Sequence, residues 1–117
     1  MPRIYIDGVF DLFHVGHLEC LKKAKNFRED TTLLVGIISD NDANDYKRLP
    51  IFNENDRYLI ISALSIVNEV IYPAPLIVTE EFINRHNIDI VLHGFSDSSD
   101  YEKQKKFYEK IEIIKEI

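Results

Sequence analysis

The stretch DGVFDLFHVGH, residues Asp7 to His17, lies between two segments of different periodicity. The run before it, Arg3 to Asp7 (RIYID), is rich in β-forming residues and ends at Gly8. After it, from Gly16 to about Arg28, apolar residues recur at every third position, which is the stripe of a helix. These are Leu18, Leu21, Ala24 and Phe27. The stretch therefore predicts a strand, a loop and a helix in succession.

The remainder of the chain repeats this alternation. Thr32 to Ser39 (TLLVGIIS) is almost wholly apolar, as expected for a strand that is covered on both faces. The other predicted strands are Glu69–Tyr72, Asp89–His93 and Ile111–Ile117, and the other predicted helices are Asn55–Leu64, one beginning at Thr79, and Asp100–Lys110. This order predicts a single α/β domain, a Rossmann-like doubly wound fold with a five-stranded, mostly parallel sheet. In such sheets ligands bind beyond the carboxyl ends of the strands.

Composition narrows the class of protein. The chain has 117 residues and a formal net charge of -6, which argues against a broad nucleic-acid or anionic-membrane surface. Its one cysteine, Cys20, excludes an intrachain disulfide and a zinc ribbon, so we expect a reducing, cytoplasmic setting. We expect no signal peptide before the first predicted strand, and no apolar run in residues 1–117 reaches the roughly 18 residues of a membrane span.

Two histidines at the first strand–helix junction make the strongest candidate site. If the helix begins near Gly16, His14 and His17 share a face of its first turn, where unpaired N–H groups favour an anion. Two imidazoles at a helix start predict a phosphate site. One alternative is that the two histidines only cap the helix or pack against Phe10 and Phe13. The other is zinc binding, but no cysteine pair lies nearby and His86 belongs to another predicted helix. We therefore expect no metal site in the protein itself.

The string resembles the HxGH signature of the nucleotidylyltransferase superfamily. Its longer form, DGVFDLFHVGHLECLKKAK, is similar to the cytidylyltransferases that make CDP-choline, CDP-ethanolamine and CDP-glycerol. Further matches follow in order: VGIISD, Lys47, NENDRY, NEVIYPAP and IDIVLHG. The resemblance covers essentially all 117 residues.

The resemblance implies a reaction in which an alcohol phosphate attacks the α-phosphate of CTP and pyrophosphate leaves, without a covalent enzyme intermediate. It implies that His14 and His17 bind the CTP phosphates and stabilise the transition state, and that Lys47 reaches the phosphates of both substrates. Mg²⁺ is expected with CTP, held mostly by phosphate oxygens and water. A homodimer is expected. The implied nucleotide-binding residues are Ile6, Asp7, Gly8, Val9, Phe10, Asp11, Gly16, Arg57, His93 and Gly94.

Several of these residues have other readings. Asp11 could orient the loop through backbone N–H groups or merely cap a turn. Arg48 could serve in place of its neighbour Lys47. Arg57 could instead form a surface ion pair with Glu54, worth ~0.5 kcal/mol. His93 closes an apolar strand and could simply be buried there.

Two departures from the family bear on function. Leu76 follows Ala-Pro where the phosphocholine enzymes typically have tryptophan, so we expect phosphoethanolamine rather than phosphocholine as the acceptor. The R-T-x-G-[IV]-S-T-[ST] motif, expected after the fifth strand, is absent from residues 1–117, and we favour an incomplete record of the natural protein. The alternative functions are a nucleotidylyltransferase that uses glycerol 3-phosphate as the acceptor, one that uses ATP, and a nucleotide-binding module with little catalysis.

Overall fold

The computed structural model of the chain describes residues 1–93 and 114–116. Its strands are β1 (Arg3–Gly8), β2 (Thr32–Ile38), β3 (Glu69–Ala74), β4 (Ile90–His93) and β5 (Ile114–Glu116). Its helices are α1 (Val15–Lys25), α2 (Asp40–Tyr46), α3 (Glu54–Ser62) and α4 (Glu80–Arg85). The predicted helix Asp100–Lys110 lies outside the described residues, as does Gly94.

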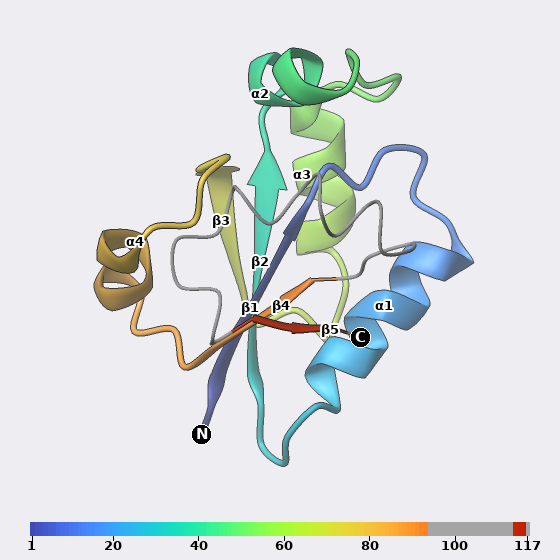
Figure 1. The fold of residues 1–117 in the computed structure, drawn as a ribbon. Coiled ribbons are helices and arrows are strands. Elements are labelled where there is room, and N and C mark those ends of the chain that lie inside the picture. The colour runs from blue at the N-terminus through green and yellow to red at the C-terminus, as the bar shows by residue number, and fades with distance from the viewer. Residues whose placement is uncertain (94–113, 117) are drawn as a thin grey trace.

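The strands form one parallel sheet in the order β3-β2-β1-β4-β5 (Figure 1). The order reverses at β1, which pairs with β2 on one side and β4 on the other. This confirms the predicted α/β fold with a parallel sheet. A reversal of this kind leaves a crevice at the carboxyl ends of the two central strands, where open sheets bind their ligands.

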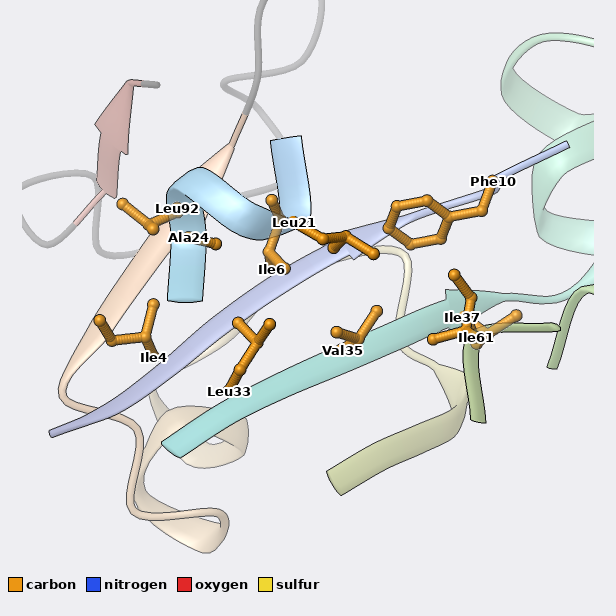
Figure 2. Close-up of a cluster of buried hydrophobic side chains, with 10 residues drawn as sticks. All are labelled: Ile4, Ile6, Phe10, Leu21, Ala24, Leu33, Val35, Ile37, Ile61 and Leu92. Atoms are coloured by element: carbon orange, nitrogen blue, oxygen red, sulfur yellow. The ribbon is translucent and has the colours of Figure 1, made fainter. Parts of the chain in front are cut away.

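Both faces of the sheet are covered in the described part of the chain. Helices α1 and α3 lie over one face and α4 over the other (Figure 1). Figure 2 shows the larger cluster, in which alternate residues of β1 and β2 meet side chains of α1 and α3. The members of this cluster are Ile4, Ile6, Phe10, Leu21, Ala24, Leu33, Val35, Ile37, Ile61 and Leu92. Strand β2 lies in the interior of the sheet, and its remaining apolar residues pack on the other face, as its uninterrupted apolar sequence predicted.

Two elements differ from the sequence prediction. The sequence pattern assigned residues 40–46 to no helix or strand, yet they form α2, which Ser39 caps by accepting a hydrogen bond from the Asp42 N–H. Strand β3 was expected to end at Tyr72, but it continues through Pro73 to Ala74. An edge strand tolerates proline, since one side of its backbone has no strand partner, and β3 lies at the edge.

Candidate active site

A cleft of about 380 Å³ opens at the carboxyl ends of β1 and β4, between the start of α1 and the end of α2. It lies where the reversal of strand order leaves the crevice. Most of the residues predicted for the site line it: Ile6, Asp7, Gly8, Val9, Phe10, Asp11, Gly16, His17, Lys47 and His93. Three lining residues were not predicted, Cys20, Ala43 and Pro50, and a fourth, Arg48, was expected only as an alternative to Lys47. His14 and Arg57 lie outside this lining, and Gly94 lies outside the described residues.

The two histidines form a reciprocal cap at the start of α1. The Nδ1 atom of His14 accepts the Gly16 N–H at 2.9 Å, and the Nδ1 atom of His17 accepts the His14 N–H at 3.2 Å. An N-cap of this kind stabilises a helix by about 1 kcal/mol. Since each Nδ1 accepts, the proton of each neutral ring is assigned to Nε2. Both imidazoles can therefore donate from Nε2.

Gly16 is required by this arrangement. A Cβ atom at residue 16 would lie 2.6 Å from Cε1 of His14, which is too close for any side chain. The glycine thus lets the His14 ring fold back over the first turn of α1, where its centroid lies 4.3 Å from that of His17. Packing of the His14 ring therefore explains the glycine of the HxGH string in this chain.

His17 has a partly buried ring. It stacks on Phe13 with centroids 5.4 Å apart and meets the edge of Phe10 at 5.9 Å. Burial, and then the neighbouring His14, lower the pKa of His17, while Asp11 opposes this shift. His17 therefore stays neutral, with its Nε2 proton, to a lower pH than an ordinary histidine.

The loop between β1 and α1 is held in an uncommon conformation. Phe10 and Leu12 have φ values of 55° and 48°, in the left-handed region that non-glycine residues rarely occupy. Between them, Asp11 accepts the backbone N–H groups of Leu12, Ile51 and Phe52 at 2.8 to 3.1 Å. Burial acts to raise the pKa of Asp11, but these three bonds and Arg48 lower it below its usual range. Asp11 thus joins the first loop to the segment before α3.

The buried side chain of Arg57 binds the same loop through the Val9 carbonyl. Its side chain is fully buried and donates to the carbonyls of Phe52 at 3.0 Å and of Val9 and Ile38 at 2.8 Å. It also pairs with Asp40 Oδ1 at 2.6 Å.

The alternative prediction, a surface ion pair between Arg57 and Glu54, is therefore wrong. Glu54 instead accepts the Asp40 N–H at 3.0 Å and the Tyr72 hydroxyl at 2.8 Å. A guanidinium that already has four acceptors is a positioning group for the loop and α2.

Helix α2 brings two cations to the cleft. Asp40, at its first position, is fixed by Arg57, and Ala43 is buried against Ile38. Lys47 is the C-cap of α2, and the N–H groups of Lys47 and Arg48 both donate to the Ala43 carbonyl. Both side chains are exposed and line the cleft.

A buried polar pair lies at the sheet end of the cleft. Nδ1 of His93 and Oδ1 of Asp7 are 3.6 Å apart, and their side chains are 12% and 6% exposed. His93 is thus part of the cleft lining, and its role there stays a prediction. Cys20 also lines the cleft, but burial raises the pKa of its thiol, with Lys23 opposing, so a nucleophilic thiolate is disfavoured.

A family model described as cytidylyltransferase-like matches residues 5–116. This chain belongs to that family. The cytidylyltransferase-like domain is 44% identical over 91 residues to choline-phosphate cytidylyltransferase A of Rattus norvegicus, covering 78% of this chain and 25% of that protein. It is 38% identical over 93 residues to ethanolamine-phosphate cytidylyltransferase of Mus musculus, covering 78% and 23%. The chain spans about a quarter of the length of these relatives.

A solved structure has a similar fold. The lipopolysaccharide core biosynthesis protein from Thermoplasma volcanium GSS1 superimposes with a TM-score of 0.77 at 30% identity, covering 100% of this chain and 96% of that one.

Residues 1–93 and 114–116 of the cytidylyltransferase-like domain lack two further features. None of its helices there has the length and hydropathy that crossing a bilayer requires. No three His, Cys, Asp or Glu side chains gather there into a set that could hold a metal ion.

Proposed function

We propose that this chain transfers CMP from CTP to a small alcohol phosphate, giving a CDP-alcohol and pyrophosphate. The observation that carries the proposal is the arrangement around the cleft. His17, fixed as an Nε2–H donor at the start of α1, and Lys47, at the end of α2, line one cleft. Donors and a cation that converge in this way suit the charge that develops on a transferring phosphate.

The proposed reaction needs positioning and charge stabilisation, with no nucleophile from the protein. An oxygen of the acceptor phosphate attacks the α-phosphorus of CTP, the bond to the bridging β-phosphate oxygen breaks, and pyrophosphate leaves with that electron pair. His14 and His17 donate from Nε2 to the triphosphate, and Lys47 offsets the charge that passes to the leaving group. Asp11 and Arg57 keep the loop in place and touch neither reactant.

Mg²⁺ belongs to this proposal as a counter-ion that arrives with CTP. Phosphate oxygens and water are its preferred ligands, so the protein needs to supply few or none.

We propose an amino-alcohol phosphate as the acceptor, with phosphoethanolamine ahead of phosphocholine. The cleft lining includes a buried carboxylate, Asp7, in addition to its lysine and arginine. A primary ammonium can donate hydrogen bonds to that carboxylate, whereas a quaternary ammonium prefers aromatic faces. Apart from the histidines, Phe10 is the one aromatic side chain in the described lining. Leu76 is outside that lining, so its substitution for tryptophan carries less weight here than the sequence suggested.

The test is pyrophosphate release from CTP or ATP, with Mg²⁺ and a panel of phosphoethanolamine, phosphocholine and glycerol 3-phosphate. The proposal expects release with CTP and fastest turnover with phosphoethanolamine. Release of pyrophosphate from ATP but not from CTP would establish the ATP-using alternative. A preference for glycerol 3-phosphate would overturn the acceptor assignment. Binding of CTP without release from any pair would favour the binding module instead.

A further inference from the structure

Arg48 lines the cleft, and so far it has been considered only as a substitute for its neighbour Lys47. It follows Lys47 directly, and its backbone N–H donates to the Ala43 carbonyl at 3.1 Å, which fixes its main chain to the last turn of α2. Its side chain is exposed and lines the cleft together with that of Lys47. Its backbone is thus anchored while its guanidinium stays accessible to a ligand.

The guanidinium of Arg48 differs from the others in the chain. Within the described residues it makes no hydrogen bond and no ion pair. Each of the other arginines has a hydrogen-bond acceptor: Arg3, Arg28, Arg57 and Arg85. The carboxylate that Arg48 influences is Asp11, but both Asp11 oxygens already accept backbone N–H groups. Within the described residues, the five N–H donors of this guanidinium therefore have unused hydrogen-bonding capacity.

We propose that Arg48 is a second phosphate-binding side chain of the cleft, whose planar guanidinium takes two oxygens of one phosphate beside the Lys47 ammonium. This inference rests on the proposed function. The two cations have different chemistry: lysine is a compact point charge, whereas arginine presents a rigid fork that matches two phosphate oxygens. The phosphate belongs either to the CTP triphosphate and its leaving pyrophosphate or to the acceptor.

Because Arg48 meets charge already present in the free substrate, it acts mainly on binding. Its loss should raise the KM of the substrate whose phosphate it holds, with a smaller effect on kcat. This split separates it from His17 and Lys47, which are proposed to act on the charge that develops during transfer.

The first test needs no turnover. Titration calorimetry measures binding of inorganic pyrophosphate to the full chain and to three variants: Arg48→Ala, Arg48→Lys and Arg28→Ala. The last removes the same charge from an exposed arginine that lies over Phe27, outside the cleft, and controls for net charge.

The steady-state arm names the source of the phosphate. KM values for CTP and for phosphoethanolamine are measured with the same variants. We expect Arg48→Ala to weaken pyrophosphate binding or to raise one KM by about 10-fold to 100-fold, the equivalent of one charged hydrogen bond. Arg48→Lys should recover part of the loss, and Arg28→Ala should stay within about two-fold of wild type.

Each outcome decides the matter. A raised CTP KM with weakened pyrophosphate binding assigns Arg48 to the triphosphate, and a raised acceptor KM alone assigns it to the acceptor phosphate. The inference is overturned if Arg48→Ala matches Arg28→Ala in every measurement. It is also overturned if the wild-type chain binds no pyrophosphate and Arg48→Ala changes neither KM. Pyrophosphate binding lost with Arg48, in a chain that turns over no acceptor, would sink the proposed function and leave this inference standing.

Discussion

Replacing Arg57 with alanine removes the group that ties three separate segments together beneath the cleft. Its guanidinium bonds to Val9 in the first loop, to Ile38 at the end of β2, and to Phe52 before α3. It also neutralises Asp40, whose side chain keeps 27% exposure. The alanine variant leaves three carbonyls and one carboxylate without these partners.

The cost follows from those contacts. Removing one member of a buried ion pair destabilises a protein by about 3–5 kcal/mol. The partial exposure of Asp40 lets water reach the abandoned carboxylate, so we expect the lower end, about 3 kcal/mol. Because a domain of this kind has only about 5–15 kcal/mol of stability, the variant should lose a large fraction of it.

Urea unfolding followed by circular dichroism measures this loss. Arg57→Lys should lie between wild type and Arg57→Ala, since an ammonium has three donors for four acceptors. Arg85→Ala is the matched control: its pair with Glu81 is exposed, so its removal should cost under about 0.5 kcal/mol. A loss below about 1 kcal/mol for Arg57→Ala, at an unchanged m-value, would refute the idea that this arginine holds the loop.

Three further predictions concern single side chains. His17→Ala should lower kcat about 10²-fold to 10³-fold in the pyrophosphate-release assay while its circular dichroism spectrum stays native; a smaller loss contradicts its role as a transition-state donor. The pKa of His17 is lower in the folded than in the unfolded chain, so the unfolded chain binds this proton first and stability falls as pH drops below about 6.5. The fall in melting temperature from pH 7 to pH 5 should therefore be shallower in His17→Gln, and equal slopes would count against the assignment. Tyr5→Phe should raise the free energy of unfolding by up to about 1 kcal/mol, because within the described residues the buried Tyr5 hydroxyl has no hydrogen-bond partner; a destabilised variant would point to a partner for that hydroxyl.

The sequence predicted those features that depend on local pattern. Short windows of sequence show the apolar runs of β1, β2 and β4. They also show the apolar residues at every third position of α1. The position of the cleft followed as well, since parallel strands bring their carboxyl ends to one edge.

Helix α2 was missed because DNDANDY has no apolar stripe, and among those of its side chains whose burial is described only Ala43 is buried. Its signal was present in Ser39 as an N-cap, followed by Asp40 and Asp42 in the first turn. That pattern could have placed Lys47 at a helix end instead of in a loop.

The burial of Arg57 could not be foreseen in the same way. Its acceptors come from Val9 and Ile38, which are 48 and 19 residues away along the chain. Only the fold brings those carbonyls together, so the NENDRY string alone was compatible with a surface ion pair. The unused guanidinium of Arg48 is likewise evident only once the bonds of Asp11 are known.

The central claim is that the cleft at the ends of β1 and β4 catalyses CMP transfer from CTP to an amino-alcohol phosphate. The most direct measurement is ³¹P NMR of the chain with CTP, Mg²⁺ and phosphoethanolamine, with His17→Ala as the control. The account predicts a pair of diphosphate resonances from CDP-ethanolamine and an equal amount of pyrophosphate in the wild type, with both strongly reduced in the variant. A spectrum in which CTP and phosphoethanolamine stay unchanged, or equal product from His17→Ala, would contradict it.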